Sequence, residues 1–179
     1  MIPHRVNLLS SPDFGFAASI LSSCCRSEEE TQAILGVLLS EDCHGVIAKG
    51  RNKSLGFALA SHDLRSIAFP QSKSARKEVD VLDRIGAQEE NVMVVQGLYV
   101  DPTHRRQGLG KELFLALSSR YPKSTWIVLV NEEDYAAKAF FLACGFTDFG
   151  PLESAEAGSN PSLFAKKYRP LGLCREAKW

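Results

Sequence analysis

The stretch "VDPTHRRQGLGKELFLAL", Val100 to Leu117, decides both the expected fold and its functional centre. Leucines recur at helical spacing on one face, which predicts an amphipathic helix: Leu109, Leu113 and Leu117. The start of this helix carries two glycines and three cations: Gly108, Gly110, Arg105, Arg106 and Lys111. Each glycine in a helix costs about 1 kcal/mol relative to alanine. The helix dipole also disfavours cations at the N-terminus, so this start needs a reason.

Anion binding at the helix start explains the glycines and the cations together. The first N–H groups of a helix have no intrahelical partner, and the dipole attracts negative charge. Glycine lets an anion approach the backbone without a Cβ in the way. The alternative is that the glycines allow tight packing against a sheet and that the arginines are merely solvated. The sequence alone leaves both explanations open.

Two common phosphate-binding motifs do not fit this helix start. A Walker loop requires glycine at position 105 and Ser or Thr at position 112, where the chain has Arg105 and Glu112. The dinucleotide pattern G-x-G-x-x-G requires a small residue at Leu113. If the site binds phosphate, it does so by another pattern.

The flanking sequence predicts a mixed α/β domain. Strands are expected at residues 5–9, 44–48, 55–60, 91–100, 124–131, 147–149 and 163–168, and helices at 14–25, 29–39, 108–120 and 132–146. The helix expected last has acidic residues at its start, Glu132, Glu133 and Asp134, and Gly145 at its end. This order demands both parallel and antiparallel pairing, in a sheet with helices on both faces.

Two regions lie outside the regular alternation of elements. Residues 64–90 are polar, with a short helix expected over 75–85, and they form either a substrate lid or a decorated loop. Residues 171–179 are expected to be a tail, which leaves 1–170 as a single domain.

Composition limits the classes of function. Lys plus Arg and Asp plus Glu number 21 each, so the net charge gives no support for binding nucleic acid or a membrane surface. No apolar run reaches the roughly 18 residues that span a bilayer. The five cysteines and four histidines lack metal-ligand spacing, so no metal site is expected. Reduced thiols in a cytoplasmic protein are the simplest interpretation of this cysteine usage.

A family resemblance rests on two motifs. R-x-x-G-x-G, Arg105 to Gly110, follows a strand ending in "LYVDP" and resembles the signature of the GNAT superfamily of acetyl-CoA-dependent N-acetyltransferases. A weaker match to that family's N-x-x-A-x-x-x-Y-x-x-x-G-F motif runs from Asp134 to Phe146. The resemblance implies a mostly antiparallel sheet of about six to seven strands with a central parallel pair.

The resemblance also implies where acetyl-CoA, the expected cosubstrate, binds. The backbone of Leu98 and Val100 would bond the pantetheine arm, and the first turn of the helix would hold the pyrophosphate. The cofactor-binding residues expected on this basis are Leu98, Tyr99, Val100, Arg105, Arg106, Gln107, Gly108, Leu109, Gly110, Lys111, Asn131, Asp134 and Phe141.

The catalytic groups are less clear from the sequence. Phe141 stands where the family often has a tyrosine acid, and a phenyl ring cannot donate a proton. Tyr99 is the candidate that replaces it, although its ring is equally suited to the core. The strand over 91–100 offers no carboxylate base. Glu89, Glu90, Asp101 or His104 could act through water, or be solvated surface residues.

The sequence therefore predicts an N-acetyltransferase that moves an acetyl group from acetyl-CoA to a primary amine of a small molecule or peptide. The alternative is a domain that binds acetyl-CoA or CoA without turnover, as a sensor or regulatory partner. No nucleic-acid or membrane partner is expected, and the chain is expected to be a monomer or homodimer. The sequence does not identify the acceptor amine.

Overall fold

The computed structural model describes residues 4–24, 28–64, 81–88, 91–152 and 161–168. Its strands are β1 (Arg5–Leu8), β2 (Cys43–Lys49), β3 (Ser54–Ser61), β4 (Val92–Val100), β5 (Thr125–Val130), β6 (Thr147–Pro151) and β7 (Ser162–Lys166). Its helices are α1 (Ser11–Cys24), α2 (Glu28–Leu38), α4 (Leu109–Ser118) and α5 (Tyr135–Ala143), with a 3-10 turn, η3 (Pro102–His104).

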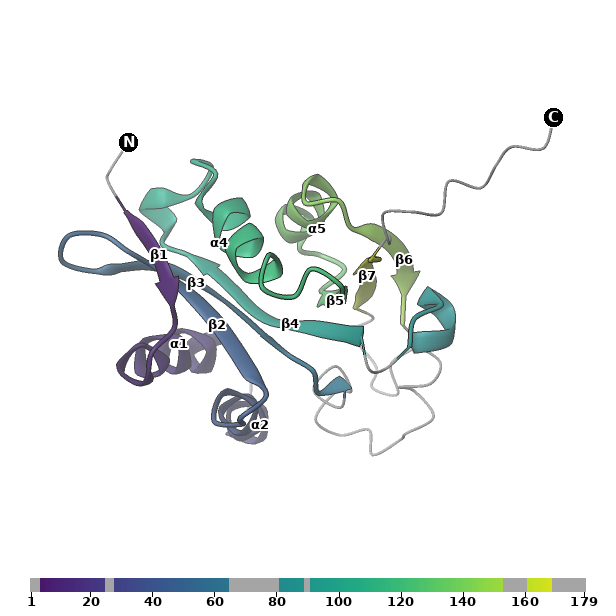
Figure 1. Ribbon diagram of the computed structural model, residues 1–179, viewed down its shortest axis with the longest axis horizontal. Coiled ribbons are helices and arrows are strands. Elements are labelled where there is room, and N and C mark those ends of the chain that lie inside the picture. Colours follow the sequence, from purple (N-terminus) through teal and green to yellow (C-terminus); the bar gives the residue numbers. More distant parts are fainter. Residues whose placement is uncertain (1–3, 25–27, 65–80, 89–90, 153–160, 169–179) are drawn as a thin grey trace.

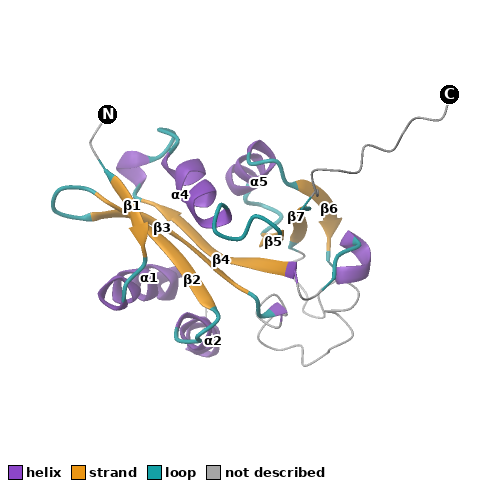
Figure 2. Ribbon diagram, viewed as in Figure 1, coloured by secondary structure: helices purple, strands orange, loops and turns teal. Residues whose placement is uncertain are grey.

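The described strands form one seven-stranded sheet in the order β1-β2-β3-β4-β5-β7-β6. Its pairings are antiparallel except for β4 with β5, which is parallel. Figure 1 shows α1 and α2 on one face of this sheet and α4 and α5 on the other. Figure 2 marks the same layers by secondary structure. The mixed, mostly antiparallel sheet with a central parallel pair is the predicted fold class.

Burial follows the alternation of side chains along β4, as expected for a central strand covered on both faces. Met93 and Val95 belong to the core beneath α4 and α5. Val92 and Val94 belong to a second core on the opposite face. The buried side chains of α4 that close the first core are Leu109, Leu113, Phe114 and Leu117.

The parallel pair of strands separates part of the way along its length. β4 and β5 are in register at three positions, of which Val94 with Ile127 is the last before the strands part. Beyond this point β4 pairs only with β3, among the described strands. Ala60 pairs with Val95 and Leu59 with Gly97, so the residue between them is a β-bulge that bends β4. β4 and β5 are therefore separated along the part of β4 that follows Val94.

The expected elements agree with the observed ones to within a few residues, with one correction at α5. This helix begins at Tyr135, so Glu132 and Glu133 precede it instead of forming its first turn. The neighbouring Asp134 is its N-cap, and the carboxylate Oδ1 accepts a hydrogen bond of 2.9 Å from the backbone N–H of Ala137.

The long segment expected at 64–90 is described only at its ends. Residues 81–85 are helical, within the expected helix, whereas 75–80 and the tail 171–179 lie outside the described residues. The helical turn lies beside β6 (Figure 1), where Arg84 donates hydrogen bonds to the carbonyls of Phe149 (2.6 Å) and Pro151 (2.9 Å). This end of the segment is thus attached to the edge of the sheet.

Candidate functional site

A cleft of about 880 Å³ lies where β4 and β5 separate, between the N-terminal end of α4 and the start of α5. Most of the cofactor-binding residues expected from the sequence line it: Leu98, Tyr99, Val100, Arg105, Arg106, Gly108, Gly110, Lys111, Asn131, Asp134 and Phe141. The fold thus gathers residues from β4, the loop after it, α4, β5 and α5 around one space.

Two expected residues do not line the cleft. The side-chain amide of Gln107 donates a hydrogen bond of 3.3 Å to the carbonyl of Thr103, within the loop itself. Leu109 is 4% exposed and packs in the core beneath α4. Because the side chain of Leu109 is buried, any contact of this residue with a cofactor would have to come from its backbone.

The loop from β4 to α4 has an unusual backbone. Arg106 has φ 58°, and Gly108, the N-cap of α4, has φ 87°. Left-handed conformations favour glycine, and Arg106 adopts one despite its Cβ. Arg105 shapes the same loop, because its Nε donates a hydrogen bond of 3.0 Å to the carbonyl of Val100.

The two glycines meet different requirements. A Cβ on Gly108 would touch nothing within 4 Å, so its positive φ is the reason for glycine there. A Cβ on Gly110 would lie 3.1 Å from Cε2 of Phe140 and 3.5 Å from Cγ2 of Val100. Both of these neighbours line the cleft, so Gly110 keeps space open between α4, α5 and β4.

An ionised carboxylate holds the start of the loop. Asp101 accepts hydrogen bonds from the Thr103 hydroxyl and, at 2.9 Å, from the Thr103 backbone N–H. Lys53, from the β2–β3 hairpin, pairs with its other oxygen at 2.9 Å. The Thr103 hydroxyl and then the Lys53 ammonium hold the pKa of Asp101 well below its usual range. This network fixes the loop at the mouth of the cleft.

Two aromatic residues expected at the site lie on opposite faces of the sheet. Phe141 is 5% exposed and packs against Phe140 and Phe146, each with ring centroids 5.1 Å away. The ring of Tyr99 stacks on Phe57 at 5.8 Å and meets Phe16 of α1 at 6.3 Å. Tyr99 therefore points to the α1 side, away from the core beneath α4 and α5.

The cleft also has lining residues that the sequence reasoning missed: Val95, Gln96, Gly97, Val128, Leu129, Val130, Ala136, Ala137 and Phe140. Most are apolar and looked like ordinary core. Gln96 was detectable, because it is the only amide side chain within the run from Val92 to Val100. Its side-chain amide donates a hydrogen bond of 2.9 Å to the Ser61 hydroxyl.

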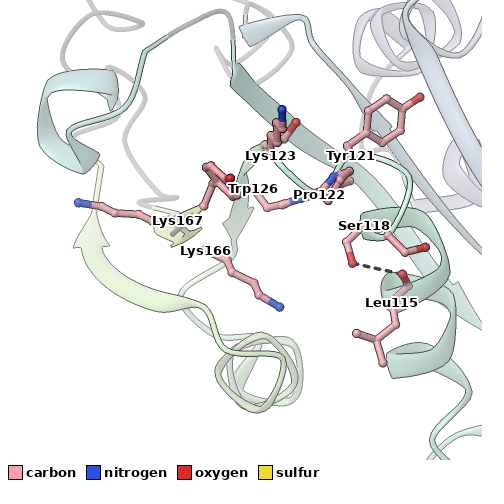
Figure 3. Close-up of a pocket in the computed structure, with 11 residues that line it drawn as sticks. Leu115, Ser118, Tyr121, Pro122, Lys123, Trp126, Lys166 and Lys167 are labelled. Carbon is pink, nitrogen blue, oxygen red and sulfur yellow. Dashed lines mark hydrogen bonds between the residues drawn. The ribbon is translucent and has the colours of Figure 1, made fainter. Parts of the chain in front are cut away.

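A second hollow, of about 630 Å³, lies at the other end of α4 (Figure 3). Lysines line it, but Lys166 and Lys167 point in different directions. Lys166 donates a hydrogen bond of 2.9 Å to the carbonyl of Cys144, at the end of α5. Lys167 lies 5.7 Å from the ring centroid of Phe149. These ammonium groups serve the fold and do not converge on one point.

Two further observations concern the described part of the chain. None of its helices has the length and apolarity that crossing a bilayer requires. The buried cysteines Cys43 and Cys144 are free thiols, and burial raises the pKa of Cys43 to about 11. A thiol with so high a pKa is a poor nucleophile at neutral pH.

Comparison with known proteins identifies the architecture. The sequence profile of the Acetyltransferase (GNAT) family matches residues 15–146. No curated protein has a sequence that matches the chain significantly.

Solved structures share the fold at low sequence identity. The ribosomal-protein-S18-alanine N-acetyltransferase of Escherichia coli is similar over 96% of this chain and 98% of its own, with a TM-score of 0.62 and 16% identity. A GNAT-family acetyltransferase of Bacillus cereus has a TM-score of 0.62 and 20% identity, over 93% and 99% of the two chains. The PaiA N-acetyltransferase of Thermoplasma acidophilum, solved in complex with coenzyme A, has a TM-score of 0.58 and 15% identity, over 93% and 100%.

Proposed function

The chain belongs to the acetyltransferase (GNAT) family, and on this premise we propose that it transfers an acetyl group from acetyl-CoA to a primary amine of a small molecule or peptide. The observation that carries the proposal is the cleft between β4 and β5, which meets the glycine-headed start of α4. We further propose that residues 1–170 form a single cytoplasmic domain.

The first turn of α4 suits the pyrophosphate. Its N-cap, Gly108, has no side chain to occupy the first N–H groups, and the dipole attracts an anion there. Arg105, Arg106 and Lys111 line the same end of the cleft and add positive charge. Neither glycine places a Cβ between the backbone and a bound phosphate.

The separated strands suit the pantetheine arm. Beyond Val94, the edge of β4 that faces β5 has no partner strand among the described residues, so an extended ligand can take its place. Leu98 and Val100 lie on this part of β4. Phe140 and Phe141, from α5, add apolar surface to the lining of the same cleft. This arrangement directs the thioester toward the point where β4 and β5 part.

Direct attack of the amine on the thioester is the simplest chemistry for this site. The amine must first lose a proton to water, since a free primary amine has a pKa of about 10.4. Its attack then forms the C–N bond, the C–S bond breaks to release CoA thiolate, and the nitrogen gives its second proton to water. A backbone N–H of Leu98 or Tyr99 is our candidate donor to the oxyanion that develops on the carbonyl oxygen. Among the described residues that line the cleft, Tyr99 is the only tyrosine, and its ring lies on the α1 face. We propose it as the acid that protonates the leaving thiolate from that face, at the point where the strands part.

A second function remains a specific alternative: binding of CoA or acetyl-CoA without turnover. Phe141 replaces a tyrosine acid, and β4 carries no carboxylate in its nine residues, Val92–Val100. A site without an acid or a base can bind a thioester and still leave it intact.

Release of CoA thiol separates the two functions. Purified protein is incubated with acetyl-CoA and a broad panel of primary amines, and free thiol is measured against buffer hydrolysis. The proposal predicts that an amine increases the release of CoA thiol. This increase should disappear in the control variant Gly110→Asp, because the substitution obstructs the cleft. Binding of acetyl-CoA without amine-dependent release from any member of the panel would establish the non-catalytic alternative.

Tyr99→Phe tests the proposed acid in the same assay. We expect kcat to fall by about tenfold while acetyl-CoA binding is unchanged, because positioned acids contribute at least that much. An unchanged kcat would assign Tyr99 a packing role only.

A further inference from the structure

We propose that the acceptor is a primary amine carried on an apolar body, preferably an aromatic one, that lies against a wall formed by the half-buried side chains of Phe16, Leu21 and Tyr99 over the buried ring of Phe57. This inference rests on the proposed function, since it concerns the second substrate of the same site. It names a class of amine, represented by 2-phenylethylamine, in place of polycationic or small polar amines.

The direction of approach follows from the side chains of β4. Leu98 and Val100 pack with the core beneath α4 and α5, on the face proposed for the pantetheine arm. Tyr99 lies between them and packs with the core beneath α1. Because the cofactor would fill the α4 face of the cleft, the acceptor must reach the thioester from the α1 face.

The wall on the α1 face is apolar and partly accessible. Phe57 is fully buried, and the rings of Phe16 and Tyr99 cover it at centroid distances of 6.0 and 5.8 Å. Both covering rings are half-buried; Tyr99 lines the cleft, and the ring of Phe16 meets that of Tyr99 at a centroid distance of 6.3 Å. A substrate with an aromatic or aliphatic body would remove this apolar surface from water.

Gly97 keeps the wall close to the cleft. A Cβ at this position would lie 3.0 Å from Cδ2 of Leu21 and 3.5 Å from Cε2 of Phe57. Gly97 itself lines the cleft, and Leu21 and Phe57 pack against it on the α1 face of β4. The side chains nearest to Gly97 on the α1 face are therefore hydrocarbon.

No charged residue of α1 or α2 is among the described residues that line the cleft. The charged residues that line the described cleft are Arg105, Arg106, Lys111 and Asp134, all in the loop before α4 or at the helix starts. Helix α1 has a single charged residue, Asp13, which is 7% exposed. Its carboxylate is bound to Lys49 at 2.6 Å and to the Ser10 hydroxyl at 2.5 Å.

A neutral polar group lies near the point where the strands part. Gln96 occupies the β-bulge two residues after Val94, and the Ser61 hydroxyl accepts a hydrogen bond of 2.9 Å from its amide. An amide beside the thioester suits a neutral amine, the form that attacks. The carboxylate of Asp13 on α1 is already paired with Lys49, and β4 carries no carboxylate, so neither element offers an unpaired one to a polycationic amine.

The test compares acceptors of different character at saturating acetyl-CoA. The kcat/KM values are measured for 2-phenylethylamine, ethanolamine and spermidine, with free CoA thiol as the readout. We expect 2-phenylethylamine to be preferred by at least about tenfold over both, which corresponds to burial of part of one ring. Comparable values for the three amines would overturn the inference while leaving the proposed function intact.

Variants of Phe16 connect the preference to the wall. Phe16→Ser is expected to lower kcat/KM for 2-phenylethylamine by about tenfold through KM, with little change for ethanolamine. Phe16→Leu keeps the apolar surface and should retain most of the preference. Leu115→Ser, at a 49% exposed leucine on α4, is the matched control and should change neither value. Equal loss for both amines in a folded Phe16→Ser variant would contradict the specificity role.

A binding measurement keeps the two proposals separate if no amine is acetylated. Saturation-transfer NMR with 2-phenylethylamine and protein saturated with CoA reports contact of the ring with the wall. Contact that is lost in Phe16→Ser would support the acceptor surface even where the proposed function fails. Absence of contact in the wild-type protein would reject it.

Discussion

The two ends of α4 both lie beside hollows lined with cations, yet only one has the features of a binding site. The N-terminal end faces the cleft of about 880 Å³, with Arg105 and Lys111 in its lining. The C-terminal end faces the hollow of about 630 Å³, with Lys123 and Lys166. Volume and charge alone do not distinguish them.

The backbone groups at these ends differ. At the N-terminal end the cap is Gly108, which provides no side-chain hydrogen bond to the first turn. At the C-terminal end the helix bonds its own last carbonyls: the Ser119 N–H donates to Leu115 at 2.9 Å, and the Ser119 hydroxyl to Ala116 at 3.0 Å. The Ser118 hydroxyl also donates to Leu115, at 3.3 Å (Figure 3).

The comparison teaches that a site is recognised by polar groups that the fold does not use itself. At the C-terminal end, carbonyls of the last turn accept local hydrogen bonds, and the Lys166 ammonium donates a hydrogen bond to the carbonyl of Cys144 at the end of α5. The N-terminal end presents donors and cations around a space that Gly110 keeps open. Substitutions at both ends of the helix and in the loop before it sharpen or break this contrast.

The largest effect is expected for Gly110→Asp. A Cβ there would lie 3.1 Å from Phe140, and the carboxylate would stand where the phosphates are proposed to bind. We expect acetyl-CoA affinity to fall by about 100-fold or more, because a fixed negative charge opposes the anion at the helix start. The change in free energy of unfolding should be smaller, about 1 kcal/mol. Calorimetric titration and urea unfolding measure the two; equal losses would favour the packing explanation for this glycine.

Reversing one charge at each end of α4 tests the electrostatic part of the contrast. Lys111→Glu should lower acetyl-CoA affinity by about tenfold at low salt, with a smaller effect at high salt because ions screen exposed charges. Lys166→Glu, at the other end, should leave affinity unchanged while lowering Tm, since Lys166 bonds the end of α5. Similar effects of both reversals on affinity would mean that long-range charge, and not the site, attracts the cofactor.

Gly108→Ala tests the backbone of the loop. With φ at 87° and no atom within 4 Å of the Cβ that alanine would add, the cost is conformational and not steric. We expect the free energy of unfolding to fall by about 1 kcal/mol. Acetyl-CoA affinity should fall by at most about fivefold, because a backbone strain of about 1 kcal/mol that opposed binding in full would correspond to that factor. Chemical denaturation checks the first value, and a fully stable variant would show that the loop tolerates another conformation.

The smallest effect is expected for Asp101→Asn. The Thr103 hydroxyl and the Lys53 ammonium lower the pKa of Asp101. The contribution of the ionised carboxylate to the folded loop is therefore complete above the ordinary Asp pKa of about 3.9, and it is lost only as pH falls through the depressed pKa. Affinity for acetyl-CoA should therefore fall about threefold in the variant, equally at about pH 5 and pH 8. An effect confined to one of these pH values would point to a different titrating group.

The sequence predicted those features that depend on local pattern. Periodicity predicted β4 and α4, and the unfavourable start of α4 pointed to the end of the helix that lines the cleft. The starts of helices were less certain, because acidic residues suit both the first turn and the cap; Glu132 and Glu133 precede α5, and only Asp134 caps it.

Features that depend on register were not predictable in the same way. The β-bulge at Gln96 changes which side of β4 each following residue faces, so the position of Tyr99 against Phe16 could not be read from alternation. The apolar lining of the cleft, including Phe140, has the composition of an ordinary core. Only the separation of β4 from β5 makes it the lining of a cleft.

Calorimetric titration of the protein with acetyl-CoA, alongside Gly110→Asp, tests the central claim most directly. The cleft predicts one site per chain with a Kd on the order of 10 μM in the wild-type protein, lost in a variant that remains folded. A folded wild-type protein that binds no acetyl-CoA would contradict the claim, and would leave the glycines of α4 with roles in backbone conformation and packing alone.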